Sequence, residues 1–559
     1  MEYNILLGGA AGQGMDTISH ILEKTLNRSG FFVFSTKDYM SRIRGGHNFY
    51  QIRFGTEPLF AQRNGFDLII ALNQETIVNH QQKLNSSGKI LCDEAIAAES
   101  ENIISLPLSA LAKDIGNPKV VNTLAAGAFL KIFGIPLDKA EELLANEFSG
   151  DILTANLKAL QEGNRIAPNV FDSINNTPQD TIFINGNEAI SLGAIAAGCR
   201  YYCGYPMTPS TSIMSYLAKH AKEVGMIVEQ TEDEIAAINM TLGASFAGLR
   251  SMVATSGGGF ALMVEALSLA GITETPIVIG MIQRPGPATG FPTRTEDADL
   301  RFVIHAGHGE FARLVIALRD PYDAFYQTIR AFDLAEKYQI PVIILSDQYL
   351  ADYAMTIKPF DFSKITVERY FDDGSSLAPG EKYKRYKLTD NGISPLLIPG
   401  KVKGQVIYVD SDEHDEEGHI TESAEMRIAM VNKRLQKYEL LRQELIEPDL
   451  LGMEDPDILV VGWGSIYGPL KEAVESLNRE GVAISALVFG DIWPLPTKRL
   501  KKMAEKAKSV IDIEQNATAQ LDGLMRQEAL LPSSKRLLKY DGRAWSADEV
   551  YNRIRKEVL

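Results

Sequence analysis

The sequence predicts a multi-domain α/β protein. The chain has 559 residues, and at about 150 residues per domain this length corresponds to roughly three to four domains. Hydrophobic residues make up 45% and charged residues 23%, a balance that excludes the disordered, collagen-like and coiled-coil classes. Short apolar runs of strand length alternate with segments of helical periodicity, which is the pattern of α/β folds.

The charge of the chain narrows the kinds of partner. It carries 56 Lys and Arg against 72 Asp and Glu, a formal net charge of −16. Such a surface repels phosphate backbones and anionic lipids, so we expect neither nucleic acid nor a membrane as partner. Residues 1–4 lack the basic start of a signal peptide, and no apolar run reaches the roughly 20 residues that span a bilayer. We therefore expect a cytoplasmic protein.

Cysteine and histidine usage predicts no metal on this chain. Cys92, Cys199 and Cys203 are too few for a disulfide framework or a four-cysteine iron–sulfur cluster, so we expect buried thiols. Two histidine pairs have spacings that a metal could use, but neither has a third ligand nearby: His305 with His308, and His414 with His419.

The first predicted domain begins with a glycine-rich loop. An apolar run at 3–7 leads into residues 8–14, and helical spacing starts at Met15. Further strands are expected at 31–35, 68–72 and 89–91. Glycines between a strand and a helix can turn backbone N–H groups toward an anion. However, Gly9, Gly12 and Gly14 do not follow the spacing G-x-G-x-x-G, so dinucleotide binding and a tight packing turn both stay open.

Two irregular segments follow in this domain. Residues 41–47 form a basic loop, which suits either contact with a phosphate or partner, or an ordinary solvated turn. Residues 164–180 are rich in Pro and Asn without periodicity, the composition of a linker.

A second α/β region and a third follow the linker. Helical spacing at 189–197 and continuous apolar strand runs predict a parallel sheet covered on both faces. These runs lie at 252–254, 276–281, 314–317 and 341–345. The following stretch is irregular and polar, with an acidic segment at 410–417 and a long helix at 423–444. The strand–helix alternation resumes at 458–461, 468–479 and 483–489.

A rigid loop at 204–211 is the most specific motif of the second region. Two prolines fix φ on either side of Thr208 and stiffen a loop that follows a strand. Ser210 or Thr211 suits the N-cap of the next helix. Capping does not account for Tyr205 or Thr208, so these two are candidates for ligand contact.

Acidic residues open a helix that is otherwise apolar or small. Glu232, Asp233 and Glu234 precede a segment without charge that extends to Gly248, which indicates a buried helix. One acid is expected to point into a dry site, where desolvation raises its pKa and the helix dipole lowers it. The alternative is a set of acids that only favours the helix dipole.

Two further loops follow strands. Residues 255–259, Thr-Ser-Gly-Gly-Gly, precede a helix and predict another backbone nest. Residues 283–294 are rich in Pro and Gly and contain Arg284 and Arg294. An arginine in a rigid loop suits a bidentate grip on a carboxylate.

Together these motifs resemble the α subunit of 2-oxoacid:ferredoxin oxidoreductases. The resemblance rests on Tyr-Pro-Met-Thr-Pro-Ser at 205–210, Gly-Ala-Ser-Phe-Ala-Gly at 243–248, the 255–259 nest and the arginine loop. The glycine loop and Arg44-Gly45-Gly46 resemble the family's γ domain, fused ahead of α. The end of the chain resembles a transketolase C-terminal domain, on residues 462–465, 493–496 and 514–521.

The resemblance implies four parts with stated bounds. They are a Rossmann-like γ domain at 1–178, a thiamine diphosphate pyrimidine-binding domain at 186–357, a connector at 358–450 and a transketolase C-terminal-like domain at 451–559.

The resemblance also implies roles for individual residues. Glu234 lies nine residues before Gly243, the family's interval, and would sit beside the pyrimidine N1′, with Glu232 in reserve. The substrate would be bound by Tyr205, Thr208 and an arginine, with Arg294 preferred over Arg284 because of its distance from Thr208. The other residues implied are Pro206, Ser256, Gly257 and Gly258 for the cofactor, and Gly12, Gly14 and Arg44 for coenzyme A or a partner.

One family motif is absent from this sequence. Thiamine enzymes bind magnesium and the diphosphate at Gly-Asp-Gly, whereas residues 373–374 and 541–542 here lack the first glycine. A β subunit is therefore expected to supply magnesium, the diphosphate site and the iron–sulfur relay to ferredoxin. A dimer of αβ units is expected.

The implied reaction converts a 2-oxoacid and coenzyme A to acyl-CoA, carbon dioxide and reduced ferredoxin. Among substrates, 2-oxoglutarate is favoured because the γ–α fusion is common in that type, with pyruvate or a branched-chain 2-oxoacid as alternatives. Two other classes stay open, a dinucleotide-dependent dehydrogenase and a non-catalytic subunit that binds coenzyme A or a partner.

Overall fold

The computed structural model describes residues 2–41, 45–96, 102–173, 176–177, 179–375, 377–378 and 380–559. The chain divides into two compact units. The first comprises Met1–Asn185 with Asp352–Pro359 and Ser546–Asp548, and the second Gly186–Ala351 with Phe360–Trp545 and Glu549–Leu559. Among the described residues, no helix is long and apolar enough to cross a membrane.

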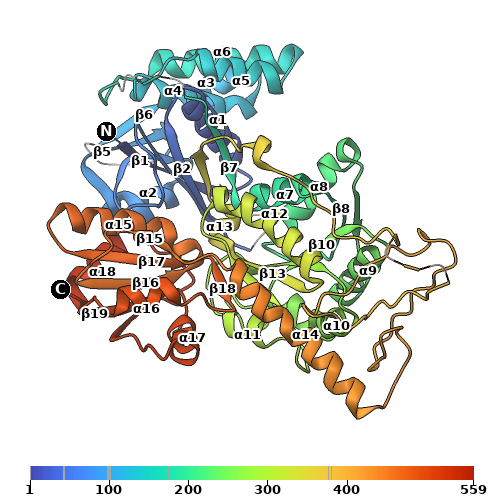
Figure 1. Cartoon of the computed structure of the whole chain (residues 1–559). Coiled ribbons are helices and arrows are strands. Elements are labelled where there is room, and N and C mark those ends of the chain that lie inside the picture. The colour runs from blue at the N-terminus through green and yellow to red at the C-terminus, as the bar shows by residue number, and fades with distance from the viewer. Residues whose placement is uncertain are drawn as a thin grey trace. The chain divides into compact units, whose positions relative to one another are not determined.

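The first unit is built on an eight-stranded sheet, drawn mainly in blue in Figure 1. Its strands, in spatial order, are β6 (Ile103–Leu106), β5 (Leu84–Asp93), β4 (Phe66–Ala71), β1 (Glu2–Ala11), β3 (Gly45–Gly55), β2 (Phe32–Asp38), β14 (Ala354–Ile357) and β7 (Ile182–Asn185). Its helices are α1 (Met15–Arg28), α2 (Gln74–His80), α3 (Leu108–Asp114), α4 (Val121–Ile132), α5 (Asp138–Glu147) and α6 (Gly150–Ile166). Apolar side chains of α1 and α4 pack with those of β1, β3 and β4 in one buried core.

This sheet is mixed, which the sequence did not indicate. Strands β1, β4, β5 and β6 are parallel, as expected for a Rossmann-like half. Strand β3 is antiparallel to both β1 and β2, and it begins inside the segment interpreted as a basic loop. Strand β14 comes from far along the chain and pairs antiparallel with β2 and β7. The predicted bounds of the second domain, 186–357, did not anticipate this pairing.

The second unit contains a seven-stranded sheet that positions the candidate site. Its order is β18 (Asp491–Trp493), β12 (Leu314–Ala317), β13 (Pro341–Asp347), β11 (Ile277–Gln283), β10 (Arg250–Thr255), β8 (Cys199–Gly204) and β9 (Ile227–Gln230). All neighbours are parallel except β18, which is antiparallel to β12. The helices of this part are α7 (Gly186–Ala196), α8 (Thr211–Val224), α9 (Glu234–Phe246), α10 (Gly257–Thr273), α11 (Leu300–His305), α12 (Pro321–Tyr338) and α13 (Gln348–Asp352). Strands β10, β11 and β13 are buried at every residue, as the continuous apolar runs predicted.

A five-stranded sheet completes the second unit, drawn in orange and red in Figure 1. Its order is β15 (Asp449–Leu451), β17 (Ile484–Phe489), β16 (Ile458–Trp463), β19 (Ser509–Glu514) and β20 (Lys535–Leu538), with α15 (Tyr467–Arg479), α16 (Lys498–Ala504), α17 (Gln520–Glu528) and α18 (Ala547–Glu557). One hydrophobic core includes residues of this sheet, such as Leu459 and Phe489, and residues of the seven-stranded sheet, such as Ile279 and Ile343. The two sheets are therefore packed into one body.

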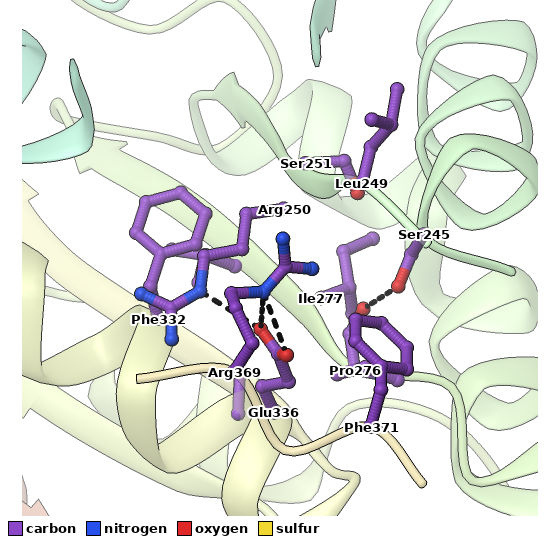
Figure 2. A pocket seen from close by; sticks show the side chains of 12 residues that line it. Ser245, Leu249, Arg250, Ser251, Pro276, Ile277, Phe332, Glu336, Arg369 and Phe371 are labelled. Carbon is purple, nitrogen blue, oxygen red and sulfur yellow. Dashed lines mark hydrogen bonds and ion pairs between the residues drawn. The ribbon is translucent and has the colours of Figure 1, made fainter. Parts of the chain in front are cut away.

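The connector between them is irregular apart from the long helix α14 (Ala424–Glu444) and a single 3-10 turn, within the part that the structure describes. Ion pairs attach it to the rest of the unit. Figure 2 shows Arg369 of the connector and Arg250 of β10 both reaching Glu336 of α12, with Nε to carboxylate distances of 2.9 and 2.8 Å.

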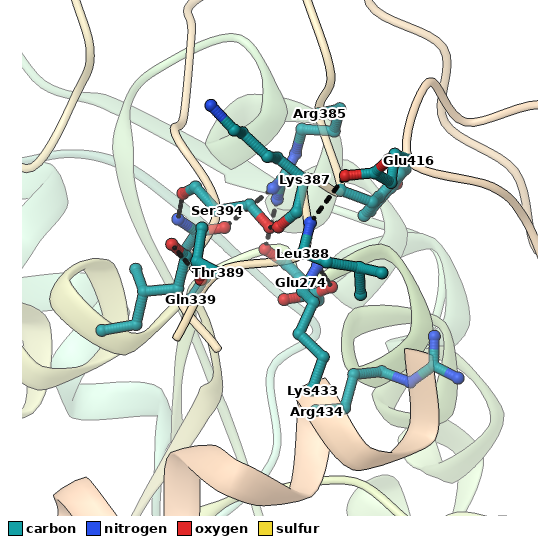
Figure 3. Close-up of polar contacts among 12 residues, drawn as sticks. Glu274, Gln339, Arg385, Lys387, Leu388, Thr389, Ser394, Glu416, Lys433 and Arg434 are labelled. Atoms are coloured by element: carbon teal, nitrogen blue, oxygen red, sulfur yellow. Dashed lines mark hydrogen bonds and ion pairs between the residues drawn. The ribbon is translucent and has the colours of Figure 1, made fainter. Parts of the chain in front are cut away.

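A second attachment point is centred on Glu274, at the end of α10 (Figure 3). Lys433 and Lys437 of α14 each lie 2.6 Å from one of its carboxylate oxygens. Arg385 of the connector donates to the Glu274 carbonyl at 2.7 Å and to Gln339 Oε1 at 2.8 Å. All of these side chains are buried, so buried charged groups help to anchor the connector.

All three cysteines are buried free thiols, which confirms the prediction for Cys92, Cys199 and Cys203. Within the described ranges, no group of three or more His, Cys, Asp or Glu side chains is arranged to hold a metal ion.

Candidate functional site

The predicted site residues meet at the carboxyl edge of the seven-stranded sheet. Parallel strands β9, β8, β10 and β11 are neighbours, so the loops that leave their carboxyl ends lie along one edge. This is the edge where open α/β sheets bind their ligands.

Glu234 is the first residue of α9, and its side chain is buried at 3% exposure. Asp233 is the N-cap and accepts a hydrogen bond from the Ala236 amide at 2.8 Å, which turns the next residue into the protein. Burial raises the pKa of Glu234, and the neighbouring charge of Asp233 adds to the effect. Its Oε1 atom has no hydrogen-bond partner among the described residues. Glu232, the reserve candidate, is exposed.

The nest at the start of α10 faces Glu234. Ser256 is the N-cap of α10 and is fully buried, yet its hydroxyl makes no capping bond and has no partner among the described side chains and backbone. Gly257 is half-buried beside the Asp299 carboxyl group, whose pKa burial raises to about 6, and Gly258 is exposed. Gly259 packs directly on Glu234. Two buried polar atoms thus lie unpaired beside a strip of bare backbone.

The 204–211 loop carries the predicted substrate residues. Tyr205 and Pro206 are exposed, and Thr208 is half-buried. Ser210 is the N-cap residue of α8, one of the two positions predicted, but its hydroxyl donates to the Met207 carbonyl at 2.8 Å and makes no capping hydrogen bond. The amide and the hydroxyl of Ser210 both donate to the Met207 carbonyl, so the hydroxyl makes no bond to the amides of α8.

Thr231 joins this loop to the acidic helix. Its amide donates to the Gly204 carbonyl at 3.1 Å, and its hydroxyl donates to the Asp233 carbonyl at 2.9 Å. The end of β8 and the start of α9 are therefore linked by one buried threonine. The sequence analysis missed Thr231, because a lone threonine between a strand and a helix carries no local signal.

The two candidate arginines, Arg284 and Arg294, have different neighbours in the structure. Arg284 donates from Nη1 to the Thr208 carbonyl at 2.6 Å, and its Nη2 lies 3.4 Å from Met207 Sδ. Burial lowers the pKa of Arg284. Arg294 is half-buried, and its Cβ would lie 3.3 Å from a Cβ built on Gly542. Thus Arg284, the less preferred of the two candidates, is joined to Thr208 by a hydrogen bond.

The glycine-rich loop of the first unit has neighbouring side chains against one of its glycines and open space beside another. Gly14 adopts φ 80°, and a Cβ placed there would lie 1.8 Å from Asn122 Nδ2. Gln13 Oε1 accepts from the Ala10 amide at 2.6 Å. A tight packing turn therefore accounts for Gly14, while the space beside Gly12 is open. Arg44 lies outside the described residues.

Three family models match the chain in succession. Residues 4–166 match the pyruvate ferredoxin/flavodoxin oxidoreductase model, 192–433 the thiamine diphosphate-binding model of pyruvate flavodoxin/ferredoxin oxidoreductases, and 456–544 core domain II of pyruvate:ferredoxin oxidoreductase. A 2-oxoacid:ferredoxin oxidoreductase subunit alpha from Sulfolobus sp. is 30% identical, over all of this chain and 97% of the relative.

The chain belongs to the 2-oxoacid:ferredoxin oxidoreductase α subunits.

Other relatives agree with this membership. The 2-oxoglutarate synthase subunit KorA of Methanothermobacter marburgensis is 31% identical, over 66% of this chain and 98% of its own length. The solved 2-oxoglutarate:ferredoxin oxidoreductase from Magnetococcus marinus, with 2-oxoglutarate, coenzyme A and succinyl-CoA bound, superimposes with a TM-score of 0.92 at 32% identity over the whole of both chains.

These comparisons confirm several predictions for this α subunit. It is an enzyme subunit with an N-terminal γ-like domain and a thiamine diphosphate-binding domain, and its multi-domain α/β class is as predicted. An α subunit implies a partner β subunit. The two other classes that the sequence left open, a dinucleotide-dependent dehydrogenase and a non-catalytic subunit, are not supported. The residue roles and the four domain bounds stay predictions.

Proposed function

We propose that this α subunit, assembled with a β subunit, catalyses oxidative decarboxylation of a 2-oxoacid with coenzyme A, giving acyl-CoA, carbon dioxide and reduced ferredoxin. Family membership supports the reaction class. The observation that supports a role for this chain in the chemistry is the buried Glu234 carboxyl group, whose Oε1 atom has no partner among the described residues. An unpaired buried carboxyl oxygen is costly in a site built only for stability.

The residues around Glu234 fit an aminopyrimidine ring. The Oε1 atom of Glu234 and the Ser256 hydroxyl are both buried and have no hydrogen-bond partner among the described residues. Thiamine diphosphate, when bound, supplies the reactive carbon and electron sink that decarboxylation requires. With the ring bound, the Glu234 carboxyl group would hold a proton toward a ring nitrogen, which would be its hydrogen-bond partner. Its raised pKa suits this task, because a carboxyl group that shares a proton is an effective acid–base catalyst.

Thr208 and Arg284 are our candidates for substrate binding. The Thr208 hydroxyl can donate to a substrate oxygen, and the Arg284 guanidinium stays charged and offers further N–H donors to a carboxylate. The 2.6 Å bond between Arg284 and the Thr208 carbonyl supports Arg284 over Arg294. Tyr205 and Pro206, which are exposed beside them, complete the predicted site with Gly257 and Gly258.

We propose 2-oxoglutarate as the substrate. The support is the M. marinus enzyme, whose structure holds 2-oxoglutarate and succinyl-CoA and which matches this chain over its full length. The KorA relatives point the same way. Coenzyme A is the proposed acyl acceptor, with Gly12, Gly14 and Arg44 as the candidate loop. We assign magnesium, the diphosphate site and the iron–sulfur cluster to the β subunit. We propose that the assembled enzyme is a dimer of αβ units.

The test uses the assembled α and β subunits under anaerobic conditions, with 2-oxoacid-dependent reduction of ferredoxin as readout. Glu234→Gln is expected to lower kcat about 10²- to 10⁴-fold, the range for loss of an acid–base group, without loss of the β subunit. Glu232→Gln is the comparison. Near-normal turnover of Glu234→Gln, or an equal loss in Glu232→Gln, would overturn the assignment. The kcat/KM values for 2-oxoglutarate, pyruvate and a branched-chain 2-oxoacid decide the substrate.

A further inference from the structure

The loop that carries Thr208 is held from two sides. Arg284 of the 283–294 loop bonds the carbonyl of Thr208 at 2.6 Å. Asn187, the second residue of α7, donates from Nδ2 to the carbonyl of Pro209 at 2.9 Å and to Ser212 Oγ at 2.7 Å. Two consecutive carbonyls are thus fixed by side chains from different elements.

Within the described residues, the hydrogen bonds of the Asn187 side chain are these two, both from its Nδ2 atom. It is 0% exposed, and its Oδ1 atom has no hydrogen-bond partner in the part of the chain that the structure describes. Because the Pro209 carbonyl can only accept, the amide nitrogen must face it. Packing alone would favour an apolar residue of similar size, since an unpaired buried oxygen is unfavourable. The two donors of Asn187 are therefore the feature that needs explanation.

We propose that Asn187 is a positioning residue for the substrate. By fixing the Pro209 carbonyl it sets the direction of the preceding residue, and so the place of the Thr208 hydroxyl against the 2-oxoacid. This inference rests on the proposed role of Thr208 in substrate binding. It does not involve Glu234, which is oriented separately through Thr231 and Asp233.

Two variants test the proposal in the assembled enzyme. Asn187→Asp keeps the size of the side chain but turns a carboxylate oxygen toward the Pro209 carbonyl, and Asn187→Ala removes both hydrogen bonds without burying a charge. Each is expected to raise KM for the 2-oxoacid about tenfold or more, as a misplaced binding group does. The KM for coenzyme A and the affinity for thiamine diphosphate are expected to stay at wild-type values. If Asn187→Asp does not assemble, Asn187→Ala decides.

The pH dependence of Asn187→Asp separates positioning from general damage. A protonated carboxyl group can donate one hydrogen bond to the Pro209 carbonyl, and burial raises the pKa of an acid. The ratio of its KM for the 2-oxoacid to the wild-type KM is therefore expected to decrease as the pH is lowered from about 8 to about 6. The Asn187→Ala variant has no such group, so its ratio to wild type is expected not to change with pH.

Ser191→Ala is the matched control. Ser191 lies on the same helix and is equally buried, and its hydroxyl donates to the Asn187 backbone carbonyl at 2.7 Å. It is expected to keep the wild-type KM. The inference falls if both Asn187 variants keep the wild-type KM, or if Ser191→Ala raises it equally. Thr208→Val distinguishes the two levels: if it raises KM while the Asn187 variants do not, only the positioning role fails, and if it too is without effect, the proposed role of Thr208 fails.

Discussion

Glu234 and Gly259 are in direct contact across helices α9 and α10. A Cβ atom built on Gly259 would lie 2.4 Å from Glu234 Oε1 and 2.1 Å from Thr255 Oγ1. Real side chains essentially never approach so closely, so the buried carboxyl group occupies its place only because residue 259 has no side chain. Gly259, which the sequence analysis grouped with the backbone nest at 255–259, thus also makes room for the Glu234 carboxyl group.

Gly259→Ala is therefore expected to displace Glu234. A shift of about 1 Å at a reacting group costs on the order of 10²-fold in rate, and we expect a loss of this size in kcat. The measurement is turnover of the assembled enzyme, together with the amount of thiamine diphosphate retained. Gly243→Ala on α9 is the control, because no atom lies within 4 Å of its Cβ position. Equal turnover of the two variants would contradict the conclusion that the Glu234 carboxyl group depends on the missing side chain of Gly259.

The two arginines of the 283–294 loop are expected to differ. Arg284→Lys removes the planar fork that holds the Thr208 carbonyl, and we expect KM for the 2-oxoacid to rise about tenfold or more. Arg294→Lys is expected to leave KM near its wild-type value. Steady-state kinetics with 2-oxoglutarate compares them, and the opposite ranking would restore Arg294 as the carboxylate anchor.

Glu274 is expected to govern attachment of the connector. Burial alone would raise the pKa of Glu274, but Lys437 and Lys433 outweigh it and lower the pKa well below its usual range. Glu274→Gln leaves two buried lysines without a counter-charge, and breaking a buried pair in this way costs about 3–5 kcal/mol. Thermal unfolding and limited proteolysis within 360–444 measure the loss. In contrast, Glu142→Gln at the exposed pair with Lys139 is expected to cost about 0–1 kcal/mol. Similar losses in both would show that the buried cluster does not anchor the connector.

Asp512 predicts a pH dependence of stability. Asp512 is fully buried, and burial together with the neighbouring Glu514 raises its pKa to about 10. The side chain of Glu514 is held by hydrogen bonds that it accepts from Trp463 Nε1 at 3.0 Å and Asn516 Nδ2 at 2.8 Å. Because the folded pKa is raised, the stability that this group contributes is present at acid pH and is lost as pH rises toward 10.

Asp512→Asn is neutral at every pH and removes this loss. Its Tm relative to wild type is expected to rise between about pH 5 and about pH 9, with at most about 1.4 kcal/mol per pH unit of differential stability. Glu505→Gln, at the exposed residue that follows α16, is the control and is expected to show no such trend. A constant difference in Tm across this range would mean that Asp512 is already charged in the folded protein.

The sequence was informative where the signal is local. Continuous apolar runs predicted the buried strands: the segment at 252–254 lies within β10, and the segment at 276–281 begins one residue before β11. The family resemblance assigned Thr208, Ser256 and the arginine loop to one site, and parallel pairing brings the loops at these strand ends to one edge of the sheet. The family's interval to Gly243 favoured Glu234 over Glu232, but only the structure shows that Glu234 is buried and Glu232 is exposed.

Long-range pairing could not be predicted in the same way. Strand β14 pairs with β2, more than 300 residues earlier, and nothing in either segment names its partner. Arg284 and Thr208, like Asn187 and Pro209, meet through side-chain to backbone bonds, which leave no periodic pattern in a single sequence.

By itself, the sequence determined the α/β class, the strand-ending loops that carry the motifs and the family that these motifs resemble, because backbone propensity and hydrophobic period act over a few neighbouring residues. Only the tertiary structure decided which acid is buried, which arginine reaches Thr208 and that Gly259 makes room for Glu234, because burial and contact depend on atoms that distant segments bring together.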